Sequence, residues 1–579
     1  MAVQLPRWQS ATLAFALYLL LSAVLVGHGA LAHFGSATIG YGPDPPVFTW
    51  DLKWWPQAIA DGLDPLHSAV VYAPQGFNTT LMTSIAGPSL VMAPVTQTFG
   101  PLASYNALAI LIPALNAWAA FLLCRQVGGS SWAALAGGYA FGFSTYVLGQ
   151  SLGHPNLSLV AMAPLAVYLV LRRRNKSIGT IAFVACLTIV LAFQFLTSTE
   201  VFLTMTMMGV AVYGLALLIL PAQRASLLPL AAPIAGAYVA AGLLVSPFLL
   251  AAVTAHLDLT HIDPVRYSAD PLNLVIPTRI TIGGETLAGI GDRFTGNLSE
   301  NGTYLGLPLL LVLGLFGWQR RRDRITLFLL AAFGIALIGA LGPRLNLLGS
   351  PTSLRLPWAP FLHLPYFKYV LPERLIVFAW LALAVILTLW LSTPSRWPAA
   401  KWALAAVGLA LLLPNPGATD PSPPHYGAAI WASRRPLPGF FAGGDSPQFR
   451  GRPNLLVLPY NEAGEGDSVY WQASAGMAYA MPGGYLTGTI PEDFACWPIV
   501  GQLRAEDYSP ANREGLLDFL AAKQVDAVVA PTAVARRAAP LLAALPGPPH
   551  RSGGVLVYEV PPMRDRMLPE PCRAVEGEN

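Results

Sequence analysis

Residues 11–32 read ATLAFALYLLLSAVLVGHGALA and form one unbroken apolar run. A helix needs roughly 20 mostly apolar residues to cross the hydrocarbon layer of a bilayer. The run is too long for the apolar core of a signal peptide, it lacks a clean cleavage site, and further apolar runs follow it. It therefore predicts a retained transmembrane helix.

The composition indicates a chain that crosses the membrane many times. Hydrophobic residues make up 54% of the 579 residues, charged residues only 11%, and the mean hydropathy is +0.52. A soluble protein has about a quarter of its residues charged. The net charge of +4 is small and comes from short arginine clusters, so no nucleic-acid partner is expected.

Further apolar runs bring the expected number of transmembrane helices to about eleven. They lie near 103–124, 131–149, 156–171, 177–196, 201–220, 227–253, 303–318, 325–343, 371–391 and 401–414. Short loops rich in Lys and Arg stay cytoplasmic. With the N-terminus inside, the even-numbered connections should be basic, and they hold Arg125, Arg172 to Arg174, Arg224, the arginines of 320–324, and Arg396 with Lys401. The C-terminal region is then predicted to be extracytoplasmic.

The long connections all fall on the predicted outer side, at 33–102, 254–302, 344–370 and 415–579. The cytoplasmic loops are short and contain no P-loop, so an ATP-driven pump is not expected. The stretch 87–101, GPSLVMAPVTQTFGP, is apolar but too short to span, which predicts an interfacial or re-entrant helix.

The C-terminal part predicts a separate unit. Residues 416–438 are rich in proline and are expected to be an extended, poorly packed linker behind a membrane domain at 1–415. Strand patterns at 454–459, 525–530 and 554–560, with a helical pattern at 516–523, predict a small α/β domain at 439–579. Cys496 and Cys572 both lie in it, where a disulfide is permitted and two free thiols are equally compatible.

Ionisable groups gather at the predicted outer ends of the helices. They are Asp44, Asp51, His154, Glu200, Glu300, Lys368, Glu373 and Arg374. Such groups are costly near a bilayer unless they function, pair or reach water. Their common depth predicts a site at the outer membrane surface that receives its substrate from the lipid.

The first outer loop contains the densest cluster, GPDPPVFTWDLKWWP at 42–56. A carboxylate of Asp44 or Asp51 can act as a general base or help to hold a divalent cation such as Mg²⁺ or Mn²⁺. The tryptophans suit the faces of sugars, and they equally suit an interfacial belt that anchors a helix while the acids face water.

The loop and four later motifs resemble the GT-C superfamily of membrane glycosyltransferases. In the loop, Asp44 is followed by Trp-x-x-x-Trp-Trp and by Gly-Leu-Asp-Pro at 62–65. FGFSTY at 141–146, GHPN at 153–156, ENGTYLG at 300–306 and LPER at 371–374 are similar to the bacterial YfhO-like branch. The resemblance covers roughly 1–415 and extends loosely to YWQ at 470–472 and GGY at 483–485. It implies a multi-pass protein of the bacterial cytoplasmic membrane.

The resemblance also implies chemistry. Enzymes of this superfamily take a sugar from a polyprenyl-phosphate donor, and the position of their catalytic base matches Asp44. Asp51 departs from the pattern and could be a second acid, a metal ligand with Asp44, or the partner of Lys53. The remaining candidates for substrate binding are Lys53, Trp54, His154, Glu200 and Glu300, with Lys368 and Arg374 for the donor phosphate.

Other interpretations remain open for these residues and for the whole chain. His154 could simply turn a short loop, Glu200 and Glu300 could each favour a helix start, and Arg374 could pair with its neighbour or snorkel. The function predicted is sugar transfer to a glycan, lipid or protein acceptor at the outer face. The alternatives are a transporter or flippase for a lipid-linked or polar substrate, with acids near the bilayer midplane, and a non-catalytic scaffold.

Overall fold

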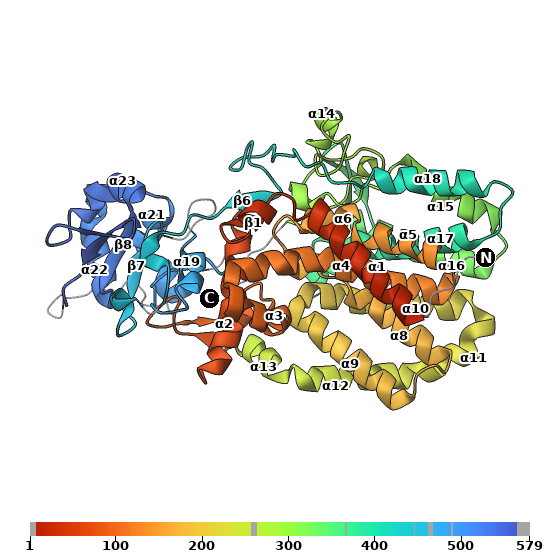
Figure 1. Ribbon diagram of the computed structural model, residues 1–579, viewed down its shortest axis with the longest axis horizontal. Coiled ribbons are helices and arrows are strands. Elements are labelled where there is room, and N and C mark those ends of the chain that lie inside the picture. The colour runs from red at the N-terminus through yellow and green to blue at the C-terminus, as the bar shows by residue number, and fades with distance from the viewer. Residues whose placement is uncertain are drawn as a thin grey trace.

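The chain is mostly helical in the computed structural model, which describes residues 7–255, 263–364, 367–444, 446–460, 467–487 and 490–563. Figure 1 shows an elongated molecule with a bundle of helices at one end and a smaller α/β region at the other. Helix α1 (Arg7–Leu25) begins at the end of the bundle that is far from the α/β region.

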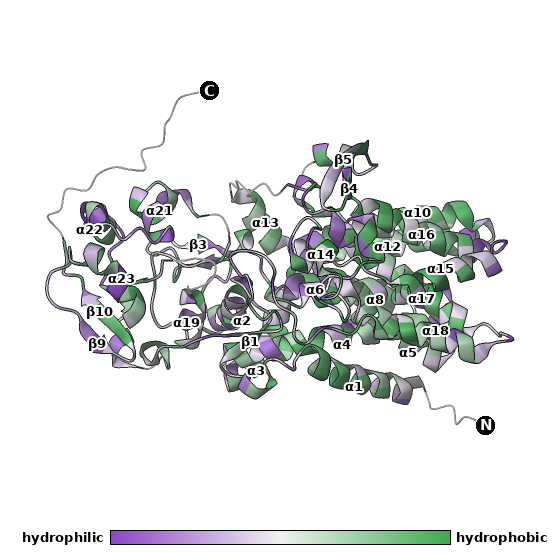
Figure 2. Cartoon of the chain, turned by 90° about the horizontal axis from the view of Figure 1, so that it is seen from above, coloured by the Kyte–Doolittle hydropathy of each residue, from purple (hydrophilic) through white to green (hydrophobic). Residues whose placement is uncertain are grey.

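The bundle is built from the predicted apolar segments. Its helices are α1 (Arg7–Leu25), α4 (Pro101–Gly128), α5 (Ser131–Gly142), α8 (Met162–Arg174), α9 (Thr180–Thr197), α10 (Thr199–Ile219), α12 (Ala231–Leu244), α15 (Leu307–Gln319), α16 (Arg324–Ala340), α17 (Ile376–Ser392) and α18 (Pro398–Ala410). Among the described residues, six helical stretches are long and apolar enough to cross a membrane, and four apolar helices are shorter. Figure 2 shows the apolar residues concentrated in this bundle. The count of about eleven spans stays a prediction.

Two predicted spans are interrupted. The run 131–149 divides into α5 and α6 (Thr145–Gln150), because the Ser144 hydroxyl accepts from the Val147 N–H and begins a new helix. The run 227–253 divides into α12 and α13 (Ser246–Thr254) at Val245, where Pro247 occupies the first turn of the second helix.

Small residues bring the central helices close together. A Cβ added to Gly137 of α5 would lie 2.2 Å from the Thr388 hydroxyl of α17, and one added to Gly142 would lie 2.4 Å from Ala117 of α4. Helices in membranes associate through such close backbone approaches, since lipid gives them little hydrophobic drive to associate.

The first outer connection is folded into short elements. These are β1 (Ala37–Ile39), α2 (Asp44–Ala60), β2 (His67–Ser68), β3 (Phe77–Asn78) and α3 (Ala86–Phe99). The stretch predicted as a short apolar helix forms α3. Later connections contain α7 (Pro155–Ser158), α14 (Ala288–Gly291) and the hairpin of β4 (Arg344–Leu347) with β5 (Ser350–Arg355).

The α/β region has a four-stranded sheet in the order β7-β8-β10-β9, with β7 parallel to β8 and the other pairs antiparallel. Its strands are β7 (Leu455–Val457), β8 (Ala527–Pro531), β9 (His550–Ser552) and β10 (Val555–Glu559). Its helices are α19 (Ser468–Ser474), α20 (Glu492–Ala495), α21 (Pro498–Arg504), α22 (Arg513–Ala522) and α23 (Thr532–Leu542). Cys496 is disulfide-bonded, and its predicted partner Cys572 lies outside the described residues.

The segment 416–438 is not the extended, poorly packed linker that its prolines predict. Within it, β6 (Ala432–Arg434) pairs with β1 in antiparallel register, with Ala37 opposite Arg434. Ile430 and Trp431 are buried, and the Trp431 indole donates to the Asn415 carbonyl at 2.6 Å. The free energy gained by burying these apolar side chains outweighs the tendency of the prolines to keep the segment extended and unpacked.

Candidate functional site

The side chains of Asp44 and His154 contact each other between two outer loops. Asp44 is the first residue of α2, where Pro45 and Pro46 favour helix initiation, and His154 precedes α7. The Asp44 Oδ2 lies 2.9 Å from the His154 Nε2, and their side chains are 36% and 22% exposed. The pair therefore reaches solvent without being fully surrounded by it.

A tight backbone contact holds these two loops together. The Tyr41 N–H donates to the Leu152 carbonyl at 2.9 Å. Gly40 has φ +80°, and a Cβ there would lie 2.3 Å from that same carbonyl oxygen. A side chain at this position would separate the loops, so glycine is required for the approach of Asp44 to His154.

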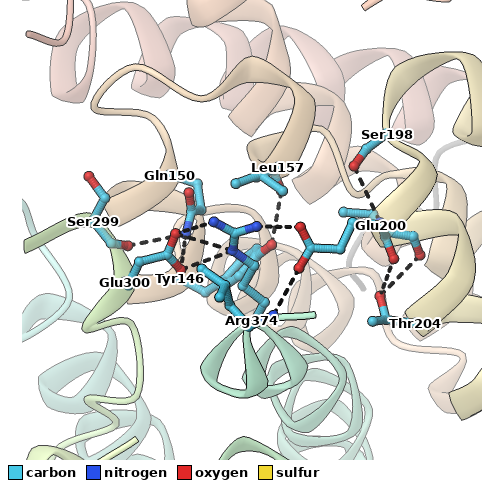
Figure 3. A network of polar contacts seen from close by, with 11 residues as sticks. Tyr146, Gln150, Leu157, Ser198, Glu200, Thr204, Ser299, Glu300 and Arg374 are labelled. Carbon is cyan, nitrogen blue, oxygen red and sulfur yellow. Dashed lines mark hydrogen bonds and ion pairs between the residues drawn. The ribbon is translucent and has the colours of Figure 1, made fainter. Parts of the chain in front are cut away.

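A second charged cluster centres on Arg374 (Figure 3). Glu200 comes from the first turn of α10, Glu300 ends a short 3-10 turn (Leu298–Glu300), and Arg374 lies in another (Pro372–Leu375). The Arg374 Nη1 pairs with the Glu200 Oε2 and its Nη2 with the Glu300 Oε1. The Arg374 Nε also donates to both oxygens of Glu300 at 3.1 Å. Three segments distant in sequence thus meet at one guanidinium.

Gln150 and His154 connect the two clusters. The Gln150 Nε2 donates to the Glu300 Oε2 at 3.1 Å, and the His154 N–H donates to the Gln150 carbonyl at 2.9 Å. Burial raises the pKa of Glu300, but the charge and hydrogen bonds of Arg374, with a lesser effect of the Gln150 hydrogen bond, hold it below its ordinary value. Asp44, His154, Glu300, Arg374 and Glu200 therefore form one continuous charged site.

Glu200 and Arg374 do not make the contacts expected if Glu200 only favoured a helix start and Arg374 only paired with its neighbour. Helix α10 is capped by Ser198, whose hydroxyl accepts from the Val201 N–H. Glu200 instead accepts from the Leu371 N–H at 3.3 Å and pairs with Arg374. Glu373 accepts a hydrogen bond from the Thr303 hydroxyl at 2.8 Å.

Asp51 does not belong to this site, which corrects its prediction as a catalytic acid. Its side chain is fully buried, and its Oδ2 accepts hydrogen bonds from the Ile85 N–H and the Ser84 hydroxyl at 2.5 and 3.2 Å. Burial raises the pKa of Asp51 to about 7, against the opposing effect of these hydrogen bonds. Asp51 thus binds the segment that leads into α3.

The pair Asp44 and Asp51 also does not fit a shared divalent cation. Seven residues of α-helix span about 10 Å, whereas two ligands of one ion lie within about 5 Å of each other. In the part of the chain that the structure describes, no group of three or more His, Cys, Asp or Glu side chains could hold a metal ion.

The tryptophans of α2 are core residues, which corrects the prediction of Trp54 as a substrate-binding residue. Trp50 and Trp54 stack with ring centroids 5.4 Å apart, and both are buried. The Trp54 indole donates to the Pro65 carbonyl at 2.9 Å and the Trp50 indole to the Gln472 Oε1 at 2.7 Å. They join the first outer connection to the α/β region.

The predicted cations have different neighbours. Lys53 is half-buried, and burial lowers its pKa while the charge of Asp61 opposes this, so Asp61 rather than Asp51 is its charged neighbour. Lys368 is exposed, with its Nζ 4.9 Å from the centre of the Tyr369 ring. The charge of Arg374 is already balanced by two glutamates. Binding of the donor phosphate by Lys368 and Arg374 stays a prediction.

Gln150 and Arg435 are two further residues of the site that were not predicted from the sequence. Gln150 follows FGFSTY and lies four residues before His154, a spacing that could have indicated it. Arg435 lies in the supposed linker, is 6% exposed, and donates to the Gly42 carbonyl at 2.6 Å, to Thr38 Oγ1 at 3.2 Å and to Asp467 Oδ1 at 2.9 Å. No local pattern reveals that a residue so distant in sequence holds the loop before Asp44.

Comparison with known proteins gives matches in structure alone. No model of a protein family matches the chain, and no curated protein does. The arabinofuranosyltransferase AftD from Mycobacteria aligns with a TM-score of 0.57 and 14% identity over 96% of this chain. This chain spans only 40% of that protein's length.

Two further structures align less closely. The oligosaccharyltransferase AglB from Archaeoglobus fulgidus, in complex with an inhibitory peptide and a dolichol-phosphate, has a TM-score of 0.49 and 14% identity, covering 93% of this chain and 72% of that one. ArnT from Cupriavidus metallidurans has a TM-score of 0.45 and 12% identity, covering 94% and 97%. The structural neighbours are GT-C glycosyltransferases, and the likeness to AftD shows that this chain shares their fold.

Proposed function

We propose that this protein is a membrane glycosyltransferase that moves a sugar from a polyprenyl-phosphate donor to an acceptor at the outer face of the membrane. The GT-C fold supports the class of reaction. The observation on which the proposal mainly rests is the Asp44–His154 pair, a half-exposed carboxylate held in place next to a buried charged cluster.

The geometry of Asp44 suits a general base. Among the described residues, His154 is the group that contacts its carboxylate, and it does so through Oδ2. Oδ1 is then open to an acceptor hydroxyl, while the bond to His154 fixes the orientation of the carboxylate. A general base must be held within hydrogen-bond reach of the proton that it removes.

The reaction proposed is a single displacement. Asp44 removes the proton of the acceptor hydroxyl, whose oxygen forms a bond to the anomeric carbon of the sugar. The bond from that carbon to the phosphate oxygen breaks, and polyprenyl phosphate leaves with the electron pair. Sugar transfer develops positive charge at the anomeric carbon.

The Arg374 cluster supports this step in a way that differs from phosphate binding. Two glutamates and one guanidinium leave a net negative charge in a mostly buried place. Fixed negative charge beside a developing cation stabilises the transition state. Arg374 then keeps Glu200 and Glu300 oriented, and its positive charge favours their ionised forms.

The proposed orientation places the N-terminus in the cytoplasm of a bacterial cell and the α/β region outside its inner membrane. The beginning of α1, helix α11 (Arg224–Leu227) and the turn between α15 and α16 lie at one end of the molecule, and the four-stranded sheet lies at the other (Figure 1). The positive residues of these turns, Arg224 and the stretch 320–324, favour the cytoplasmic side. Helix α2, which begins with Asp44, lies between the bundle and the α/β region.

The test uses the full chain in lipid vesicles. Polyprenyl-phosphate hexoses and pentoses, labelled in the sugar, are supplied with glycan, lipid and peptide acceptors. We expect labelled acceptor and free polyprenyl phosphate in equal amounts. Passage of the intact donor across the vesicle membrane without release of polyprenyl phosphate would identify a flippase instead. If neither transfer nor passage occurs, the scaffold interpretation is the one that remains.

A further inference from the structure

Three buried polar atoms without partners lie within one short segment beside the charged site. They are the Gln150 Oε1, the His154 Nδ1 and the Asn156 Oδ1, which have no hydrogen-bond partner among the described residues. Gln150 is 1% exposed and Asn156 is 5% exposed. Buried polar atoms in folded proteins are nearly always hydrogen-bonded, because an unsatisfied one costs about 1–3 kcal/mol.

The contacts of Gln150 settle which end of its amide lacks a partner. The nitrogen faces two acceptors, the Ser299 carbonyl at 3.2 Å and the Glu300 Oε2 at 3.1 Å. Exchanging the amide ends would bring an oxygen against both of these oxygens. The free atom is therefore the oxygen, and what it lacks is a donor.

The chemistry of His154 points the same way. Its Nε2 lies 2.9 Å from the Asp44 carboxylate. A neutral imidazole that donates from Nε2 has its lone pair on Nδ1, so this atom also accepts. Both acceptors belong to residues next to Glu300, since the Gln150 amide bonds Glu300 and the His154 N–H donates to the Gln150 carbonyl.

We propose that the Gln150 Oε1 and the His154 Nδ1 accept hydrogen bonds from hydroxyl groups of the sugar that is transferred, so that this segment selects the donor sugar. A sugar ring offers several hydroxyl donors on neighbouring carbons, which can supply the donors that several acceptors of one short segment lack. Their position beside the Glu200–Arg374–Glu300 cluster matches the ring whose anomeric carbon reacts. Asn156 supplies a third acceptor on the same segment. This inference rests on the proposed function.

The test compares donors rather than absolute rates. Polyprenyl-phosphate sugars in which single hydroxyls are replaced by hydrogen are assayed with the unmutated protein and with Gln150→Met, which keeps side-chain length without the acceptor. In the unmutated protein, the deoxy donor that loses the Gln150 contact should have a kcat/KM lower by about 5- to 100-fold. In Gln150→Met, removing that hydroxyl should no longer lower kcat/KM, whereas removing other hydroxyls should lower it as much as in the unmutated protein.

This ratio does not depend on the folded fraction, because both donors are measured on one preparation. Gln194→Met is the matched control, since Gln194 in α9 is also fully buried with both amide atoms unpartnered in the described part of the chain. Gln194→Met should show the same loss of kcat/KM for each deoxy donor as the unmutated protein. If Gln150→Met also shows the same losses of kcat/KM, water supplies the hydrogen bond to Gln150 and the inference is overturned. If the unmutated protein transfers no donor sugar, the proposed function itself is overturned, and the inference with it.

Discussion

The two aspartates of α2 have the same chemistry and opposite surroundings. They are seven residues apart, which places them on nearly the same side of the helix and two turns apart along it. Asp44 is 36% exposed and pairs with His154, whereas Asp51 is fully buried and binds the Ser84–Ile85 segment. The difference shows that the neighbours of a carboxylate, supplied by other segments, decide whether it can react or only hold the fold together.

The largest effect should come from Asp44→Asn. The amide keeps the size of the side chain but cannot remove a proton, and a general base typically contributes about 10²–10⁴-fold to rate. We expect sugar transfer to fall by this factor while the thermal unfolding midpoint changes little. Asp61→Asn, at the exposed C-terminal end of the same helix, is the control and should keep full activity. Equal activity of both variants would remove Asp44 from the mechanism.

The second effect is a pH dependence of stability that belongs to Asp51. Because its pKa is raised to about 7 in the folded state, the folded protein binds more protons than the unfolded chain between about pH 4 and pH 7. Stability should therefore fall as pH rises through this window, by at most about 1.4 kcal/mol per pH unit. Above the window this group adds no further change.

Asp51→Asn removes that titration. Thermal unfolding in detergent, followed from pH 4 to pH 8, should show a smaller decline for the variant than for the unmutated protein, and sugar transfer per folded molecule should be retained. Parallel pH curves for the two proteins would contradict the assignment. A loss of sugar transfer as large as that of Asp44→Asn would show that Asp51 takes part in catalysis.

The smallest effect should come from Trp50→Phe, next to Asp51 on the buried part of α2. Phenylalanine cannot donate to the Gln472 Oε1, so a buried acceptor loses its partner. We expect a loss of about 1–2 kcal/mol of stability, read from the unfolding midpoint, with transfer per folded molecule unchanged. Trp132→Phe, at a residue that is 73% exposed, should leave the midpoint where it is. A drop in transfer without a drop in stability would show that the ring serves the reaction.

Patterns that depend on neighbouring residues were predictable from the sequence. The apolar runs gave helices, the segments at 454–459 and 554–560 contain β7 and β10, and those at 516–523 and 525–530 overlap α22 and β8. The breaks at Ser144 and Val245 were missed because one cap or one proline interrupts an otherwise apolar run.

The site was only partly predictable, for a different reason. That Asp44, His154, Glu200 and Arg374 belong together followed from their common place at helix ends. Which aspartate is buried, and that Arg374 is already neutralised, depend on partners from distant segments. Local sequence contains no record of those partners.

The contact between Trp50 and Gln472 has a consequence for how the chain is made. The two residues are 422 positions apart, and Arg435 lies 397 positions after Thr38, which it contacts. At roughly 5–20 residues per second, synthesis of that interval takes on the order of 20–80 s. During this time the loop that begins with β1 lacks its final packing partners, so its tryptophans need cover from lipid or a chaperone. Ribosome stalling or truncation before residue 435 should leave an inserted bundle with an immature outer loop.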